Sequence, residues 1–380
     1  MSTLSPKQAA SLAYIAYDAR KGGNYENTPI EIKNDFTLND LAKGTSGGYF
    51  FRQETGFALL GKGKGKSQRY RNDLVIACRG TASLADGITD LTCNRKGTDT
   101  GEMVHSGFQT TFYSMRSGLK KFLLENPTTE FGTVHCVGHS LGGALATLAA
   151  NWIAADPSFK GKVNLYTFGS PRVGLKSFSV KSSSRISKHF RCVNGADPVT
   201  KAPVWPFYHV PYDGSEYILE RAQGMRATAH GLDVYRTHSR VESWEKLGFQ
   251  RANHVFKRIV LNYNNRLQVS SSPEWADKLS AAILTLMVDG GYAALVFAGQ
   301  NLGAGIATIY DAIARSIVKI SELSSEFQER VKGLLGHMLV FAGKGAQVAI
   351  KFTYSFIRWV FELVLRKLNQ AVKAAIKATF

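Results

Sequence analysis

The run Gly138-His139-Ser140-Leu141-Gly142, which continues with Gly143 and Ala144, constrains this chain more than any other feature. It follows a short apolar run typical of a buried strand and opens an Ala-rich stretch with helical spacing. A serine on a tight strand-to-helix turn needs small residues two positions to either side, because strand and helix approach closely there. The run therefore predicts a serine hydroxyl exposed at the end of a sheet, beside a helix N-terminus that favours negative charge.

Strand-like and helical stretches alternate from about residue 70 to residue 265. The strand-like runs are 74–78, 134–137, 163–168 and 190–193, and helical spacing marks 108–122 and 141–155. This alternation is typical of a mostly parallel sheet covered on both faces, so we expect an α/β fold. Ser5 and Pro6 suit the N-cap and first position of an N-terminal helix, and that segment lacks the pattern of a Sec signal peptide.

The formal net charge of +18 favours an anionic partner. The chain has no Arg-rich block and no spacing typical of an RNA-recognition or zinc-knuckle module, so nucleic acid is not the expected partner. None of the four cysteines forms a CxxC pair, and Cys78, Cys136 and Cys192 lie in strand-like runs. We expect buried free thiols and no metal site.

A nucleophilic serine needs a base and a group that orients the base. Where the serine stands on a turn of this kind, the acid follows it in the chain and the histidine comes last. Asp197 stands directly after the strand-like run 190–193 and beside Pro198, which makes it the predicted acid. Asp213 and Asp233 are weaker candidates because no strand-like run precedes them.

Four histidines follow Asp197 and precede the C-terminal region. His254 is the favoured base, because it begins an apolar segment that would return to the sheet and hold the imidazole rigidly. His230, His238 and His209 remain alternatives. The oxyanion of an acyl-transfer reaction also needs donors, and the backbone N–H of Leu141 is one. The turn Arg79-Gly80-Thr81, after the run 74–78, is the expected source of the second.

Seven motifs, in this order, resemble the class 3, fungal-type lipases of the α/β-hydrolase superfamily. They are CRGT (78–81), VHSGF (104–108), VGHSLGGALA (137–146), YTFGSPRVG (166–174), VNGADPVTKAP (193–203), YHVPYDGSEYI (208–218) and NHVFKRI (253–259). The resemblance implies Ser140, Asp197 and His254 as the catalytic triad and Thr81 and Leu141 as oxyanion donors. It assigns His209 to a non-catalytic position and a lid to residues 82–94.

The chain departs from the family at three points. Asn253 stands where the family usually has Asp before the histidine. The sequence also shows no pattern typical of the signal peptide or of the disulfides that secreted members carry. We expect a hydrolase domain over residues 1–267, a linker at 268–275, and a helical unit over 276–380 that has no counterpart in the simple family members.

The C-terminal region leaves two structural questions open. Residues 290–310 carry no charge, which suits either a bilayer span or a buried helical hairpin. Residues 344–380 hold seven Lys or Arg and one acid, a net charge of 7 − 1 = +6. Such a helix can lie in a membrane interface, or it can be a core helix with a solvated stripe.

The resemblance implies hydrolysis of lipid esters through an acyl-enzyme, with no metal or organic cofactor. The basic charge favours phospholipids of bacterial membranes as the substrate. Class 3 lipase motifs, no Sec signal pattern and a cationic, apolar C-terminal region together resemble the lipase effectors of type VI secretion systems. Such effectors would act at membranes after export without a Sec signal. Such an effector would have an immunity protein and a secretion-system component as partners. The alternatives are an intracellular housekeeping triacylglycerol lipase or esterase, and a membrane-inserting toxin whose C-terminal helices carry the activity.

Overall fold

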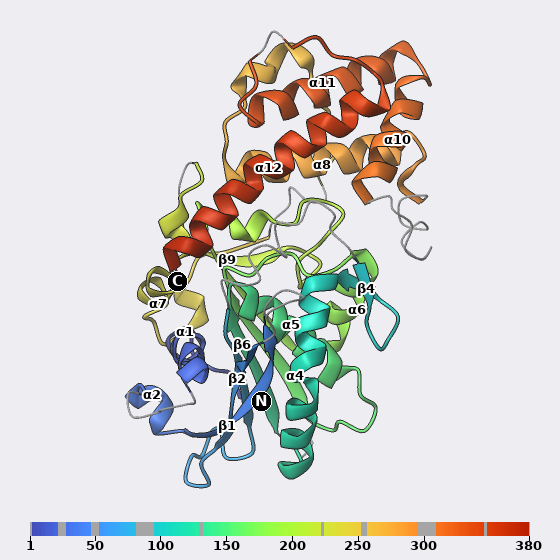
Figure 1. Ribbon diagram of the computed structural model, residues 1–380. Helices are drawn as coiled ribbons and strands as arrows, with labels where there is room; N and C mark the ends of the chain where they lie inside the picture. The colour runs from blue at the N-terminus through green and yellow to red at the C-terminus, as the bar shows by residue number, and fades with distance from the viewer. Residues whose placement is uncertain are drawn as a thin grey trace.

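The computed structural model has two parts, a sheet flanked by helices and a C-terminal group of helices beside one end of that sheet (Figure 1). It describes residues 2–21, 28–46, 53–80, 95–128, 132–221, 224–251, 257–294, 309–345 and 348–379. The predicted buried thiols at Cys78, Cys136 and Cys192 are confirmed, and Cys93 lies outside the described residues.

The main sheet of the described residues has eight strands in the order β1-β2-β3-β6-β7-β8-β9-β10. Strands β3, β6, β7, β8 and β9 are parallel, whereas β1, β2 and β10 pair antiparallel at the two edges. The bounds are Phe36–Ser46, Gln53–Gly63, Leu74–Cys78, Thr133–His139, Lys162–Phe168, Lys188–Asn194, Ser215–Glu220 and Phe249–Arg251, in sheet order. A separate hairpin joins β4 (Arg95–Gly97) and β5 (Met103–His105). The predicted α/β-hydrolase fold with a mostly parallel sheet is confirmed.

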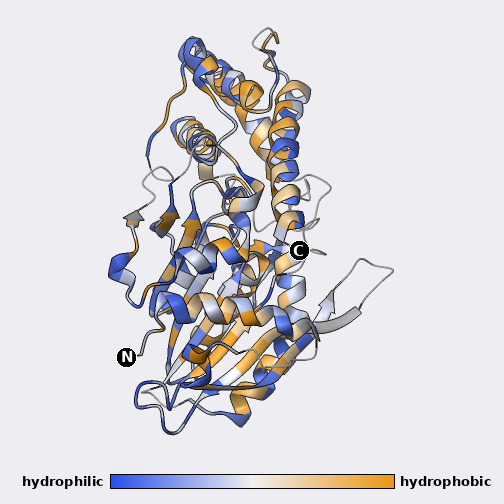
Figure 2. Ribbon diagram, turned by 90° about the vertical axis from the view of Figure 1, so that its left-hand side faces the viewer, coloured by the Kyte–Doolittle hydropathy of each residue, from blue (hydrophilic) through white to orange (hydrophobic). Residues whose placement is uncertain are grey.

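Alternate residues of the central strands enter two different cores. On β3, Ile76 packs with helices α4 (Ser106–Glu125) and α5 (Leu141–Ala154), whereas Val75 packs with α1 (Pro6–Ile15) on the opposite face. This alternation follows from the two-residue period of a strand, and it explains why the central strands read as unbroken apolar runs. Figure 2 shows these hydrophobic strands between helices with hydrophilic outer faces.

The remaining helices of the sheet-containing part are short. They are η1 (Ala16–Lys21), α2 (Ile30–Lys33), α6 (Lys176–Arg185), η3 (Val199–Lys201), η4 (Ala227–His230), α7 (Leu232–His238) and η5 (Trp244–Lys246), where η marks a 3-10 helix. The predicted N-cap of α1 is present, because the Ser5 hydroxyl accepts a hydrogen bond from the backbone N–H of Gln8 and the Gln8 side chain accepts one from the Ser5 N–H.

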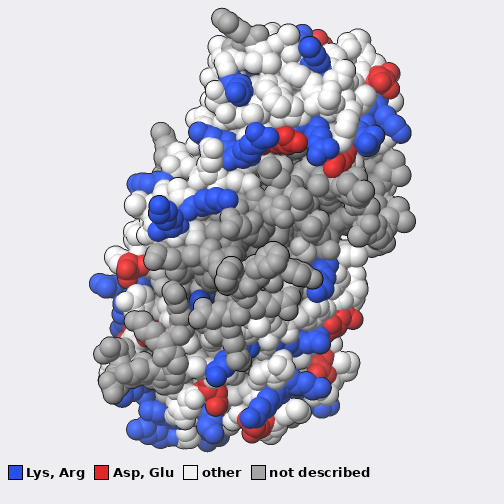
Figure 3. Space-filling model, viewed as in Figure 1, with Lys and Arg blue, Asp and Glu red and all other residues white. Residues whose placement is uncertain are grey.

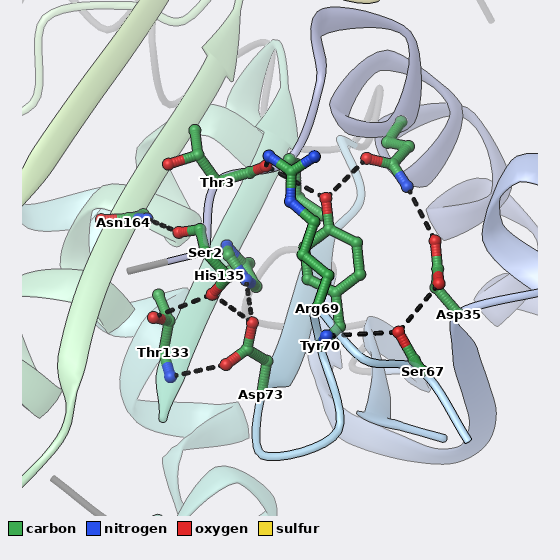
Figure 4. Close-up of polar contacts among 12 residues, drawn as sticks. Ser2, Thr3, Asp35, Ser67, Arg69, Tyr70, Asp73, Thr133, His135 and Asn164 are labelled. Carbon is green, nitrogen blue, oxygen red and sulfur yellow. Dashed lines mark hydrogen bonds and ion pairs between the residues drawn. The ribbon is translucent and has the colours of Figure 1, made fainter. Parts of the chain in front are cut away.

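The segment before α1 is anchored at the end of the sheet where β3 and β6 begin (Figure 4). The Ser2 hydroxyl donates to the Asp73 carboxylate, which also bonds His135 Nε2 at 3.0 Å and accepts from the Thr133 N–H at 2.9 Å. The Leu4 N–H donates to the Tyr166 hydroxyl at 3.0 Å. This largely buried polar network holds the N-terminal segment against the amino ends of the parallel strands.

The C-terminal helices form a core of their own. The unit comprises η7 (Tyr263–Gln268), α8 (Pro273–Asp289), α10 (Ile309–Ser321), α11 (Ser325–Phe341) and α12 (Tyr354–Thr379). Helix α12 turns Ile357, Val360 and Val364 inward, which fits the interpretation of a core helix with a solvated stripe. Residues 295–308 lie outside the described part of the chain, and no described helix is long and apolar enough to cross a membrane.

The two parts meet where residues of the sheet-containing part enter the core of the helical unit. Trp205 and Phe207, which follow η3, pack among the residues of the helical unit, and so do Ile259 and Leu261. The backbone N–H of Ile259 donates to the Thr285 hydroxyl of α8 at 3.0 Å. Residues 257–262 therefore pack against the helical unit ahead of the predicted linker, and they form no strand.

We predict that the protein loses stability as the pH falls below neutral. Burial lowers the pKa of His135 and His209 from 6.5, and lowers that of His189 to about 4. Because the unfolded chain binds these protons first, the free energy of unfolding should fall between about pH 6.5 and pH 4.5, by up to about 1.4 kcal/mol per pH unit for each histidine. Urea unfolding across this range measures the slope. His189→Gln should reduce the slope, and an unchanged slope would contradict the assignment.

Candidate active site

Ser140 stands between the end of β6 and the start of α5, as the motif predicts. Its backbone has φ 58° and ψ −131°, and no other non-glycine residue of the described part has a positive φ. A Cβ on Gly138 would lie 2.1 Å from the carbonyl oxygen of Gly142, and one on Gly142 would lie 2.2 Å from that of Cys78. The two glycines thus allow the strained turn that presents the serine.

One imidazole joins the serine to the predicted acid. His230 Nε2 lies 2.7 Å from Ser140 Oγ, and His230 Nδ1 lies 2.8 Å from Asp197 Oδ2. Because a carboxylate only accepts hydrogen bonds, Nδ1 carries the proton and Nε2 accepts from the serine hydroxyl. The three side chains are 0% to 1% exposed, so the contacts lie in a water-poor setting where they are strong.

His230, an alternative in the sequence analysis, thus occupies the place predicted for His254. His254 lies outside the described residues, and the premise that favoured it is wrong, because residues 257–262 form no strand that returns to the sheet. The other two alternatives are engaged elsewhere. His209 Nε2 donates to the Thr200 carbonyl at 2.8 Å, and His238 Nδ1 lies 3.2 Å from Asn194 Oδ1.

Three donors converge on the buried carboxylate of Asp197. Besides His230, the Tyr235 hydroxyl donates to Oδ2 at 2.7 Å and the Val199 N–H donates to Oδ1 at 2.8 Å. Burial and the nearby Asp197 charge raise the pKa of Tyr235, which keeps its phenol protonated as a donor. No sequence pattern points to Tyr235, since only the packing of α7 against β8 brings it to Asp197.

Gly169 follows β7 and lies against Asp197 and His230. Its φ is +58°, and a Cβ there would lie 2.8 Å from Asp197 Oδ2 and 3.1 Å from His230 Nδ1. Any side chain at this position would therefore press on the hydrogen bond between the acid and the imidazole, in addition to straining the backbone.

His139 supports the imidazole from behind. Its Nε2 lies 2.9 Å from the His230 carbonyl oxygen and its Nδ1 lies 2.8 Å from the Tyr17 hydroxyl. Because the carbonyl can only accept, Nε2 donates and Nδ1 accepts from Tyr17. Burial, together with the neighbouring His230, lowers the pKa of His139 well below its usual value, which keeps this ring neutral.

The predicted oxyanion donors are described in part. Leu141 is the first residue of α5, so its N–H is one of the helix-start donors without a partner inside the helix. Thr81 and the predicted lid, 82–94, lie outside the described residues. The described geometry thus brings together a serine hydroxyl, an imidazole, a carboxylate and a backbone N–H at the start of α5.

Part of the chain that holds this site is similar to a known protein family. Residues 75–207 match the family model for lipase (class 3). This region is similar to the class 3 lipase family. The matched segment contains Ser140 and Asp197, whereas His230 lies beyond it.

Three curated relatives illustrate the range of the family. Secreted mono- and diacylglycerol lipase 1 of Fusarium solani is 33% identical over 139 residues, 35% of this chain and 40% of the relative. Phospholipase A(1) DAD1, chloroplastic, of Arabidopsis thaliana is 34% identical over 152 residues, 35% of this chain and 34% of the relative. Toxin TseL of Vibrio cholerae serotype O1 is 31% identical over 203 residues, 50% of this chain and 28% of the relative. The chain thus spans well under two thirds of each of these proteins.

Solved structures with likeness to this chain include fungal lipases. The lipase of Rhizopus microsporus var. chinensis gives a TM-score of 0.41 at 21% identity, over 58% of this chain and 77% of that one. The triacylglyceride lipase of Rhizomucor miehei gives 0.43 at 23% identity, over 56% of this chain and 77% of that one.

We predict that Gly169→Ala lowers the turnover of a soluble ester by about 100-fold, because the methyl group displaces Asp197 or His230. Gly101→Ala is the matched control. Gly101 also has a positive φ, +84°, but nothing lies within 4 Å of the position of its Cβ. The control should keep turnover within about twofold of the unsubstituted protein. Equal losses in the two variants would show that backbone strain, and not contact with the acid and imidazole, explains the effect.

Proposed function

We propose that this chain is a lipid carboxylic-ester hydrolase that uses Ser140 as nucleophile, His230 as general base and Asp197 as the orienting acid. The observation that carries the proposal is the unbroken set of hydrogen bonds from Ser140 Oγ through His230 to Asp197. Nucleophile, base and orienting group within hydrogen-bond reach of one another are the arrangement that serine hydrolases share on unrelated folds.

The reaction follows from these positions. Ser140 Oγ attacks the ester carbonyl while its proton passes to His230 Nε2, and the carbonyl oxygen becomes an oxyanion. His230 then gives the proton to the departing alcohol as the C–O bond breaks, which leaves an acyl group on the serine. Water then attacks this ester while its proton passes to His230, and the imidazolium returns that proton to Ser140 Oγ as the fatty acid leaves. Throughout, the Asp197 carboxylate accepts the hydrogen bond from His230 Nδ1–H and stabilises the imidazolium.

The oxyanion is held by the N–H of Leu141 in this account, with Thr81 as the second donor. Removal of one such donor costs about 3 kcal/mol of transition-state stabilisation in comparable hydrolases. The α5 N-terminus adds its dipole at the same place. Because Ser140 is 1% exposed, the site has to open before a lipid ester reaches the serine.

Membrane phospholipids are the substrate class that we favour. The chain has a net charge of +18, and Figure 3 shows Lys and Arg side chains on both parts of the molecule. On α12, Arg366 and Lys377 are exposed on the side away from its apolar face. Basic groups near an anionic bilayer contribute about 1 kcal/mol each to binding, which would concentrate the enzyme at its substrate.

The biological setting that we propose is an antibacterial effector that is delivered by a type VI secretion system and blocked by an immunity protein. Support comes from the similarity to Toxin TseL over 50% of this chain. The runner-up is a housekeeping triacylglycerol lipase or esterase. The inward-facing apolar side of α12 argues against a toxin that acts by inserting its C-terminal helices, because insertion would first require that helix to leave its core.

Mass spectrometry of the products tests the chemistry. Purified protein with mixed phosphatidylglycerol and phosphatidylethanolamine vesicles should release free fatty acid and lysophospholipid, and triacylglycerol emulsions should give less product. Ser140→Ala should lower the rate by at least about 10³-fold. If no lipid in either preparation releases fatty acid, the lipase proposal is wrong.

A growth assay tests the setting. Directed to the bacterial periplasm, the protein should stop growth, and Ser140→Ala should remove the effect because the toxicity requires ester cleavage. If Ser140→Ala permeabilises cells as well as the unsubstituted chain does, the helices carry the damage and the catalytic account of toxicity fails.

A further inference from the structure

The helical unit contacts both loops that carry the partners of Ser140. Helix α8 packs against η3, which begins two residues after Asp197, and α12 packs against η4, which ends at His230. We propose that the C-terminal helical unit positions the catalytic site, with Asp277 of α8 fixing the Asp197 loop and the last turns of α12 fixing the His230 loop. This inference rests on the proposed function, since it assigns a role within the same reaction.

Asp277 binds two cations of the sheet-containing part. Its Oδ1 accepts from Arg172 Nη2 at 2.6 Å, and its Oδ2 accepts from Lys201 Nζ at 2.7 Å. The side chain of Asp277 is 3% exposed, and Arg172 and Lys201 are buried as well. One carboxylate of the helical unit therefore supplies a countercharge to two buried cations next to the catalytic loop.

From these cations the contacts continue to Asp197. Arg172 Nη1 donates to the carbonyl oxygens of Lys201 at 2.8 Å and Pro203 at 2.9 Å, which fixes the chain that leaves η3. At the other end of η3, the Val199 N–H donates to Asp197 Oδ1 and the Thr200 hydroxyl donates to the Asp197 carbonyl at 2.9 Å. The position of the Asp197 carboxylate thus depends on η3, and η3 is tied to α8 through Asp277.

Energetics make this tie strong. Removal of one partner from a buried ion pair is strongly destabilising, because a buried charge is left uncompensated. Here the loss of the Asp277 charge would leave both Arg172 and Lys201 without this countercharge. Relief of that penalty requires the cations to move toward water, and η3 would move with Lys201.

The end of α12 makes the second contact. Val372, Ala375 and Ile376 are buried and belong to the core of the sheet-containing part, where Val199 of η3 is also a member and Ala227 of η4 packs against it. In Figure 1, α12 runs from the helical unit down to the sheet-containing part, where it contacts η4. The apolar face of α12 thus covers the outer side of the loop that presents His230.

A pair of carboxamide variants of the full-length chain tests the first contact. Asp277→Asn removes the charge at the catalytic loop. Asp289→Asn is the control on the same helix, because Asp289 accepts from Arg258 at 2.9 Å and from Arg330 and contacts no catalytic loop. With p-nitrophenyl butyrate, Asp277→Asn should lower kcat about 10- to 100-fold with KM within about twofold, whereas Asp289→Asn should keep both values within about twofold.

A pair of isoleucine variants tests the second contact and decides the question if Asp277→Asn does not fold. Ile376→Ala opens space against η4, and Ile357→Ala opens equal space within the helical core. Both should lower the urea midpoint of unfolding to a similar extent, because each leaves a cavity in a packed core. Only Ile376→Ala should lower kcat, and it should also slow the reaction of Ser140 with a fluorophosphonate.

The positioning role is overturned if Asp277→Asn has the same kcat as Asp289→Asn and Ile376→Ala has the same kcat as Ile357→Ala. Failure of the proposed function has a different signature, because the unsubstituted chain would then show no turnover that depends on Ser140. Asp277→Glu adds a rescue test. Restored charge should recover most of kcat, and an Asp277→Glu variant no more active than Asp277→Asn would count against the ion pair as the cause.

Discussion

The hydrogen bond between the Asp197 carboxylate and the His230 imidazole depends on more of this fold than any other contact. A buried carboxylate is stable only if donors replace the water it has lost. Here the donors come from three segments, namely His230 in η4, Tyr235 in α7 and Val199 in η3. The chain from residue 197 to residue 235 must therefore fold back on itself at the end of the sheet. Gly169 leaves room for that arrangement, and His139 supports the imidazole from behind.

Local pattern was sufficient to predict part of this site. The strand, turn and helix around Ser140 and the strand before Asp197 follow from apolar runs and from glycines that sterics require. His230 was not favoured because its position depends on tertiary contacts. It ends a four-residue 3-10 helix with no periodic signal, and that helix is held by α12, more than 120 residues further along the chain. The apolar residues after His254 suggested a strand, but Ile259 and Leu261 pack on the helical unit instead.

The helical unit is the part of the molecule for which sequence reasoning was least complete. Charge and apolar content in α12 fitted either a membrane-interface helix or a core helix, since both have one apolar and one cationic face. The structure turns the apolar face toward α10, α11 and the catalytic loops, and leaves the cationic face outward. One helix can thus hold the His230 loop and also offer charge to an anionic bilayer, with no change in its packing.

The most direct test of the assigned base is the rate at which a fluorophosphonate labels Ser140 in His230→Gln and in His254→Gln, with the labelled residue identified by tandem mass spectrometry. The account predicts that the adduct forms at Ser140, that His230→Gln slows labelling by at least about 10³-fold, and that His254→Gln labels at close to the unsubstituted rate. Loss of labelling in His254→Gln with retention in His230→Gln would contradict the account.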